Sequence, residues 1–419
     1  MSAKHFAATF PPEIRDEIID RVLDTVTTKS CTLVCHDWLP RARTNLFRKF
    51  TFPPNARSEY QPEDLSEYKE KLELLAEDMA SSSISPPYSR IVRILTVRLP
   101  LLISRENLAF NTLISQLPFT NLQSLDFSSR NLDSTSLLHL LEKNPLLESL
   151  ALSSFTCSSN HLLRLLSRIA AGRSSLQSLT LGVIPTCPPD LTNTWDSPFD
   201  ASSTPLSLHP PRLQSLSFST LSRPTCNLVN PKTWVLPFFT IPEHFFDLSS
   251  LCYLTLKSHV PRRYPIILQQ CGPTVTHFTL TSFNRNFFGP SLAPSFRHLT
   301  KLVDLTLTEI FESKFSDTVA ILKSILSVVI QRLEHLSLEF RTLYHWPSLD
   351  AESFGNNCLC EIDNLLDGFL QTGQIVHATS LKKLSLKIPT HYNMDETEIR
   401  AYFSATNANG RLSLEVSLY

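Results

Sequence analysis

The stretch LQSLDF, residues 122–127, shows a spacing that returns along most of the chain: an apolar residue, two others, an apolar residue, one other and a final apolar residue. Apolar residues that alternate in this way indicate a strand with one buried face. VRILTV at residue 92 and GRLSLEV near residue 410 are weaker copies. The other clear copies are LESLAL, LQSLTL, LQSLSF, LCYLTL, VTHFTL, LVDLTL, LEHLSL and LKKLSL, which begin at residues 147, 176, 213, 251, 275, 302, 333 and 381.

Amphipathic segments fill several of the gaps between these copies. Apolar residues recur at helical spacing in STSLLHLLEKN, HLLRLLSRIAA, DTVAILKSILSVVIQ and EIDNLLDGFLQT, residues 134–144, 161–171, 317–331 and 361–372. A strand and a helix that alternate at about 25–30 residues are the signature of leucine-rich repeats, whose units stack into a solenoid because none can bury its apolar face alone. The Asn usual at the ninth position of the repeat is missing, so we expect irregular turns; the residues found there in four successive copies are Arg130, Phe155, Ile184 and Leu221.

A short helical segment precedes the repeats. Pro11 and Pro12 suit the first positions of a helix, and apolar residues follow every four positions at Ile14, Ile18 and Val22. The β-branched run at residues 25–28 predicts an interruption, with a second short helix over residues 31–35 and a third from residue 37. The predicted fold class is therefore α/β, a small three-helix module followed by an irregular leucine-rich-repeat solenoid.

Four segments stand in order near the amino terminus: FPPEI, II, LVCHDW and LF, which begin at residues 10, 18, 33 and 46. In this order they resemble an F-box, whose pattern is a Leu-Pro-x-Glu-Ile opening, two apolar helical turns, Leu-Val-Cys-x-x-Trp and a closing Leu-Phe. The chain departs from the family at Phe10, which replaces Leu, and between Leu23 and Cys31, where it is shorter and has Thr28 in place of an apolar residue. The segment LVCHDWLPRAR, residues 33–43, is similar in sequence to F-box proteins common in fungi. Here the pattern stands as Phe10-Pro11-Pro12-Glu13-Ile14, Ile18-Ile19, Leu33-Val34-Cys35-His36-Asp37-Trp38 and Leu46-Phe47.

The resemblance implies a docking module. F-boxes place an apolar helical surface against the Skp-type adaptor of a cullin–RING ubiquitin ligase, and an apolar stripe too large for a small unit to bury is typical of a protein interface. The alternative is that Ile14, Ile18 and Trp38 form the core of the module itself. The residues expected to bind the adaptor are Phe10, Pro11, Pro12, Ile14, Ile18, Leu33, Val34 and Trp38.

The chain is expected to contain three segments: an F-box module at 1–55, a linker with an acidic amphipathic helix at 56–88, and a leucine-rich-repeat domain at 89–419. This organisation resembles the non-catalytic substrate-recognition subunits of SCF-type ubiquitin ligases, in which the F-box holds the adaptor and cullin and the repeats hold a target protein. The alternative is a leucine-rich-repeat interaction scaffold whose F-box-like module has no role in ubiquitin transfer.

The target is expected on the later repeats. Side chains alternate across a strand, so the third and fifth residues of each motif point away from the core and line the open face of the solenoid, and the residue after the motif extends that row. In the early repeats these residues are small, whereas the later repeats carry aromatic and charged side chains suited to directed contacts. The predicted target-binding residues are Tyr253, Lys257, His277, Asp304, His335, Glu339 and Lys383.

The composition excludes several classes of function. A formal net charge of −1 provides no field that would attract nucleic acid or an anionic membrane, and no apolar run is long enough to span a bilayer. The sequence has no Gly-x-Ser-x-Gly or His-Glu-x-x-His, and Gly368-x-x-x-x-Gly373 is followed by Gln-Ile instead of Lys-Ser/Thr. The cysteine pairs at 31/35 and 358/360 lack the second pair of a zinc site. We therefore expect no catalysis, cofactor or metal, and a protein of the reducing cytoplasm or nucleus.

Overall fold

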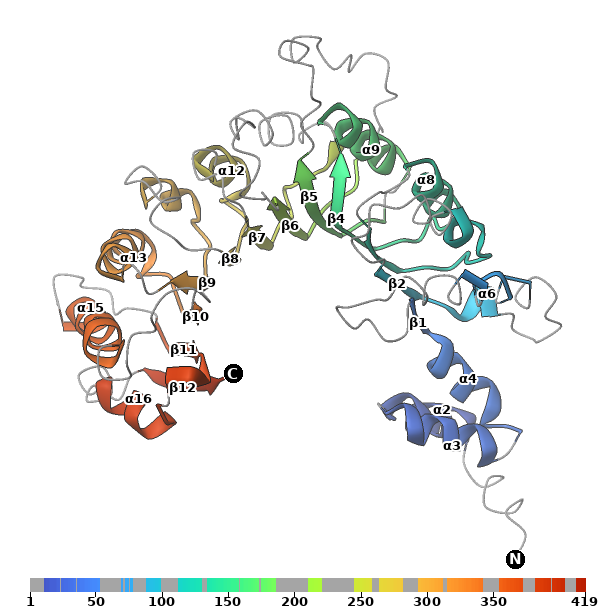
Figure 1. Ribbon diagram of the computed structural model, residues 1–419, viewed down its shortest axis with the longest axis horizontal. Coiled ribbons are helices and arrows are strands. Elements are labelled where there is room, and N and C mark those ends of the chain that lie inside the picture. Colours follow the sequence, from blue (N-terminus) through green and yellow to red (C-terminus); the bar gives the residue numbers. More distant parts are fainter. Residues whose placement is uncertain are drawn as a thin grey trace, which may run out of the picture. The chain divides into compact units, whose positions relative to one another are not determined.

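The computed structural model divides into two compact units, Met1–Pro211 and Arg212–Tyr419, and each contains parallel strands accompanied by helices (Figure 1). Phe10, most of the predicted linker and most of residues 183–211 and 223–246, which separate motif copies, lie outside the described residues. The structure describes residues 11–22, 24–34, 36–52, 69–70, 72–74, 76–77, 88–98, 112–129, 134–157, 159–172, 175–185, 210–220, 245–257, 264–281, 293–311, 315–341, 354–371, 381–392, 394–403 and 412–419.

The first unit begins with three helices and continues into a parallel sheet. Its strands pair in chain order, each parallel to the next: β1 Lys49–Phe52, β2 Ile94–Arg98, β3 Ser124–Ser128, β4 Ser149–Cys157 and β5 Ser178–Pro185. Helices α8 and α9 pack against each other beside these strands. The helices are α2 Pro12–Arg21, α3 Thr25–Val34, α4 Leu39–Phe47, α6 Tyr88–Ile91, α8 Ser134–Lys143 and α9 Ser159–Ala171.

The second unit repeats this arrangement with more strands. Parallel pairing in chain order joins β6 Ser215–Thr220, β7 Tyr253–Lys257, β8 His277–Thr281, β9 Asp304–Phe311, β10 His335–Arg341, β11 Lys383–Ile388 and β12 Ser413–Leu418. In Figure 1 the long helices of this unit follow one side of the strands, and none of the helices that the structure describes covers the other face of the sheet. The helices are α12 Tyr264–Cys271, η4 Ala293–His298, α13 Phe315–Val329, η6 Gly355–Leu359, α15 Cys360–Gln371, η7 Thr390–Tyr392 and α16 Glu396–Tyr402.

The recurring six-residue motif explains where the strands form. The ten copies from VRILTV to LKKLSL each supply one strand that begins at the third residue, and their first, fourth and sixth residues are buried, as at Leu251, Leu254 and Leu256. The last copy supplies β12, in which Leu414 is buried and Val416 is partly buried. The four amphipathic segments predicted as helices correspond to α8, α9, α13 and α15. The α/β prediction is confirmed, and the strand–helix alternation is consistent with a leucine-rich-repeat solenoid.

A repeated pair of hydrogen bonds fixes the register of the strands. The carbonyl of the second motif residue accepts the N–H groups of the second and third residues of the next motif. Thr276 O, for example, accepts from Val303 N at 2.8 Å and from Asp304 N at 3.0 Å, and Arg93 O does the same for residues 123 and 124. Because every repeat starts at the same register, residues at one motif position form rows that run across the strands.

Asn144 makes a further tie between repeats in the first unit. Its side chain is buried at the carboxyl end of α8, where its Oδ1 accepts the Leu122 N–H at 2.8 Å. Its Nδ2 donates to the carbonyls of Phe119 (3.0 Å) and Leu140 (2.8 Å). The amide therefore satisfies three buried backbone groups. Asn144 does not occupy the ninth position of its repeat, where leucine-rich repeats usually have an Asn.

Candidate interaction surfaces

The middle helix of the amino-terminal module is longer than predicted. The expectation of an interruption at residues 25–28 and a helix only at 31–35 is wrong, because α3 runs from Thr25 to Val34. Asp24 caps this helix by accepting the Thr27 N–H at 2.7 Å, and that hydrogen bond lowers the pKa of Asp24. Thr28 is buried, and its hydroxyl donates to the Asp24 carbonyl at 2.8 Å. The polar side chain is therefore satisfied at a position where the F-box pattern has an apolar residue.

The core of the three helices is very small. Ile19, Cys31 and Ala42 are buried, and Val22 and Trp38 pack against them. Trp38 precedes α4 and is half-buried in this core, so of the predicted adaptor-binding residues that the structure describes it is the one that supports the module from inside. A core of this size leaves most apolar side chains of the module outside.

An ion pair and an amide hold α2 against α4. Arg41 Nε donates to Asp20 Oδ1 at 2.7 Å, its Nη2 contacts the other carboxylate oxygen, and the Arg41 hydrogen bond lowers the pKa of Asp20. Asn45 Nδ2 donates to the Ile19 carbonyl at 3.2 Å. These polar contacts fix the two helices without enlarging the apolar core.

The outward-facing apolar residues of α2 and α3 form what we call the exposed helix set: Ile14, Ile18, Val26, Leu33 and Val34, with exposed fractions of 45, 40, 75, 86 and 52%. Ile14 and Ile18 lie one helical turn apart, and Val26 and Leu33 lie two turns apart, so each pair shares one face of its helix. Pro11 and Pro12 are also exposed. Val26 was missed by sequence reasoning because it lies inside the segment that was predicted not to be helical.

On the second unit the predicted target-binding residues come together on the face of the sheet that carries no helices. Tyr253, His277, Asp304, His335 and Lys383 occupy the same motif position in successive strands and are cross-strand neighbours. The Tyr253 ring is half-exposed and stacks on the His277 ring with centroids 4.4 Å apart. We call these five residues the aromatic–charged row.

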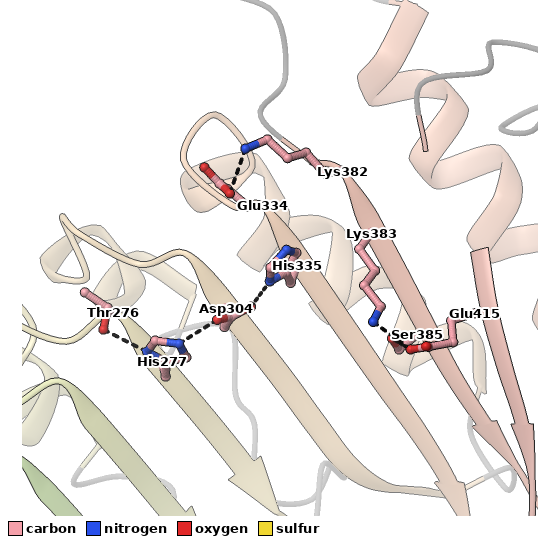
Figure 2. Close-up of polar contacts among 9 residues, drawn as sticks. All are labelled: Thr276, His277, Asp304, Glu334, His335, Lys382, Lys383, Ser385 and Glu415. Atoms are coloured by element: carbon pink, nitrogen blue, oxygen red, sulfur yellow. Dashed lines mark hydrogen bonds and ion pairs between the residues drawn. The ribbon is translucent and has the colours of Figure 1, made fainter. Parts of the chain in front are cut away.

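Asp304 lies between two imidazoles (Figure 2). His277 Nε2 lies 2.7 Å from Asp304 Oδ2, and His335 Nδ1 lies 2.5 Å from Oδ1. Because a carboxylate only accepts hydrogen bonds, both imidazoles donate to Asp304. Thr276 Oγ1 lies 2.8 Å from the other ring nitrogen of His277. The chain of contacts fixes the His277 ring and, through the stack, orients Tyr253 toward solvent.

Further ion pairs lie on or next to strands β10, β11 and β12, beside the Asp304 contacts. Lys383 Nζ lies 2.8 Å from Glu415 Oε2, and this contact together with the Ser385 hydroxyl lowers the pKa of Glu415 (Figure 2). Lys382 Nζ lies 2.8 Å from Glu334 Oε2 and lowers the pKa of Glu334 in the same way. These pairs are exposed to solvent, so they contribute positioning more than stability.

A second charged group lies further along the strands. Glu309 is almost buried at a bulge in β9 with φ of 56°, and its Oε1 lies 3.0 Å from Lys257 Nζ and 2.7 Å from Arg341 Nη1. Lys387 Nζ lies 3.8 Å from Glu339 Oε2. Lys257 and Glu339 directly follow their motifs and were predicted for that reason, whereas Glu309 and Arg341 were missed because they lie two and three residues after the motif. The positive φ is a conformation that few residues other than Gly adopt.

Neither a metal site nor a membrane span is found in the part of the chain that the structure describes. No three His, Cys, Asp or Glu side chains there are grouped to hold an ion, and none of the described helices has the length and apolarity to cross a bilayer. Cys31 lies in the core of the helical module.

Comparison with known proteins does not assign this chain to a family. No protein-family model matches the chain, and no curated protein matches its sequence. One similar solved structure is the crystal structure of the leucine-rich repeat-containing protein LegL7 from Legionella pneumophila, with 15% sequence identity, a TM-score of 0.41 and coverage of 82% of this chain and 86% of that chain. A TM-score this low does not define a shared fold, so the repeat architecture rests on the strand register and the buried motif positions.

Proposed function

We propose that the protein is a non-catalytic substrate-recognition subunit of an SCF-type cullin–RING ubiquitin ligase. Its helical module would bind a Skp-type adaptor and through it a cullin, and the open face of the second unit would bind a target protein. The contribution to ubiquitin transfer is proximity, because a target held on the ligase has a high effective concentration near the reactive thioester.

The exposed helix set carries this proposal. Among the residues that the structure describes in α2 and α3, five large apolar side chains are exposed, whereas the core that these helices form with α4 has Ile19, Cys31 and Ala42 as its buried residues. Apolar surface in this proportion is unfavourable in water unless another protein covers it. The match of residues 10–47 to the F-box pattern, with its ordered Pro-Pro-Glu-Ile and Leu-Val-Cys-x-x-Trp segments, favours a Skp-type adaptor as that protein.

Binding of a purified Skp-type adaptor to the full chain, measured by biolayer interferometry, tests the proposal. Leu33→Asp places a charge in the exposed helix set, and because Leu33 is 86% exposed the fold does not depend on its side chain. We expect adaptor affinity to fall about 30-fold or more, since an unpaired charge in a desolvated interface costs roughly 2–5 kcal/mol.

Leu146→Asp is the matched control, because Leu146 is also exposed (58%) and lies outside the three helices. It should bind the adaptor as the unaltered chain does. Equal affinity of a folded Leu33→Asp protein would contradict adaptor docking through α3. If the unaltered chain does not bind the adaptor at all, the alternative of an interaction scaffold without a ubiquitin role is favoured.

A further inference from the structure

The open face of the second unit carries a continuous line of hydroxyl groups. The fifth motif residue is Ser or Thr in six neighbouring strands, and each is paired in register with the next. All six side chains are partly exposed. We call them the hydroxyl row: Ser217, Thr255, Thr279, Thr306, Ser337 and Ser385.

Longer side chains stand on both sides of this row. The aromatic–charged row lies two residues earlier on the strands, and Lys257, Glu309, Arg341 and Lys387 lie two or more residues later. Neighbouring positions on one face of a strand are about 6.6 Å apart, so the two flanks are roughly 13 Å apart. The short hydroxyl side chains therefore form the floor of a trough that runs across the strands.

The floor offers hydrogen-bonding groups that the protein has not used. The structure describes all six residues of the hydroxyl row. Among them, Ser385 alone has a hydrogen bond from its side chain to another side chain, Glu415, at 3.0 Å. A hydroxyl can rotate to donate or to accept, so it can bind either an N–H or a carbonyl. The backbone groups of the strands themselves are engaged in the parallel sheet.

The dimensions of the trough fit an extended chain. Six strands at about 4.8 Å spacing span roughly 24 Å, and an extended peptide of seven residues is about 23 Å long. Such a peptide presents alternating N–H and C=O groups along its length. The exposed ring of Tyr253 stands beside the row and can pack against one side chain of the peptide.

The charges on the two flanks favour an acidic partner. The carboxylates on this face are already held by neighbouring lysine, arginine, histidine or serine groups; they are Asp304, Glu309, Glu339 and Glu415. Lys257 and Arg341 share a single oxygen of Glu309, and Arg341 also has a hydrogen bond with the Tyr419 side chain. A guanidinium has five N–H donors and an ammonium has three, so both cations keep donors beside this carboxylate. A basic peptide would have to displace these cations, whereas an acidic peptide can bind their remaining donors.

We infer that this trough binds an acidic, extended peptide segment of about seven residues, with the hydroxyl row contacting the peptide backbone. The inference rests on the proposed target-binding role of the same face and specifies the kind of target segment. It does not depend on adaptor binding by the helical module.

The experiment pans two phage libraries on the full-length protein, one displaying linear heptapeptides and the other the same heptapeptides closed by a disulfide. Linear peptides with net negative charge should be enriched. Their synthetic versions should bind in fluorescence anisotropy, and versions with each Glu or Asp replaced by Lys should not.

The Thr279→Val/Thr306→Val variant removes two central hydroxyls while keeping side-chain shape, and peptide affinity should fall about tenfold or more. Thr180→Val is the control, because Thr180 has the same motif position on β5 of the first unit; it should leave affinity unchanged. A Ser217→Ala/Ser337→Ala variant, which removes only oxygen atoms, repeats the test if the valines disturb the fold.

The inference is overturned if no linear peptide is enriched, if only disulfide-closed or basic peptides are, or if both hydroxyl variants bind as tightly as the unaltered chain. The libraries contain neither adaptor nor ligase, so such a failure leaves adaptor docking untouched. A failure of adaptor binding by the unaltered chain would in turn leave the peptide result standing.

Discussion

Replacing Asn144 by Ala should destabilise the first unit more than its small change in volume implies. The Asn144 side chain is 1% exposed and has three hydrogen-bonded backbone partners, Leu122 N, Phe119 O and Leu140 O, at 2.8–3.0 Å. In the Asn144→Ala protein these groups lose their partner in a region where Phe119 and Leu122 are themselves completely buried. Water has little access to compensate.

The magnitude follows from the number of groups left unsatisfied. A buried backbone group without a hydrogen bond costs about 1–3 kcal/mol, and the three groups share one site, so we expect a loss of roughly 3 kcal/mol and not the full sum. For a unit of this size, 1 kcal/mol corresponds to about 2–4 °C, so the melting temperature of the first unit should fall by roughly 6–12 °C.

Thermal unfolding combined with amide hydrogen exchange measures this effect. Exchange of the Leu122 amide should accelerate strongly, while amides of the second unit keep their protection. Asn121→Ala is the matched control, because Asn121 is only half-buried and makes one long contact to the Arg90 carbonyl at 3.3 Å. Equal melting temperatures for the Asn144 and Asn121 variants would show that the buried amide is not the tie between repeats that we describe.

Other predictions concern packing and titration. Gly272→Ala should destabilise the second unit by about 2 kcal/mol or more, because a Cβ there would lie 2.2 Å from the Leu268 carbonyl oxygen and 2.8 Å from the His298 carbonyl. Gly368→Ala, with nothing within 4 Å of the added carbon, should instead stabilise α15 by roughly 0.5–1 kcal/mol, and opposite shifts in chemical unfolding check the pair. Partial burial raises the pKa of Asp126, although Arg98 lies nearby. The folded protein therefore favours the protonated Asp126, and the ionised Asp126 reduces stability at pH values above its folded pKa. Asp126→Asn should therefore raise the melting temperature at pH 7, by an amount that shrinks as the pH falls through the folded pKa; a lower melting temperature at pH 7 would mean that the Arg98 pair outweighs burial.

Much of the solenoid could be predicted from the sequence because the repeat sets two requirements at once. The apolar positions of each motif must be buried, and the register of each strand must match that of its neighbours. The eleven copies therefore predicted the positions of strands β2 to β12 correctly. β1 was missed because residues 49–52, KFTF, alternate over a single short stretch without the motif. It is held by pairing with β2, a contact between distant residues that local pattern does not contain.

Local chemistry explains the remaining differences. The α3 helix was shortened in the prediction because β-branched residues disfavour helix formation in general, yet Asp24 supplies a cap and Thr28 bonds back to it. The α16 helix has a capping box between Asp395 and Glu398 that was visible in the sequence as Asp-Glu-Thr-Glu. The sequence could not reveal that Glu309 is the partner of Lys257 and Arg341, because Glu309 reaches them through a bulge with positive φ.

The central claim is that one chain holds an adaptor with its helices and a target with its repeats, and that the two activities are separable. Quantitative affinity purification and mass spectrometry of three forms of the full chain tests it most directly: the unaltered protein, Leu33→Asp, and a variant with alanine at Tyr253, His277, Asp304 and His335. We predict that Leu33→Asp loses the Skp-type adaptor and the cullin but keeps the remaining partner, and that the alanine variant loses that partner but keeps the ligase components. Adaptor and cullin recovered equally with folded Leu33→Asp, or absent from all three purifications, would contradict the account.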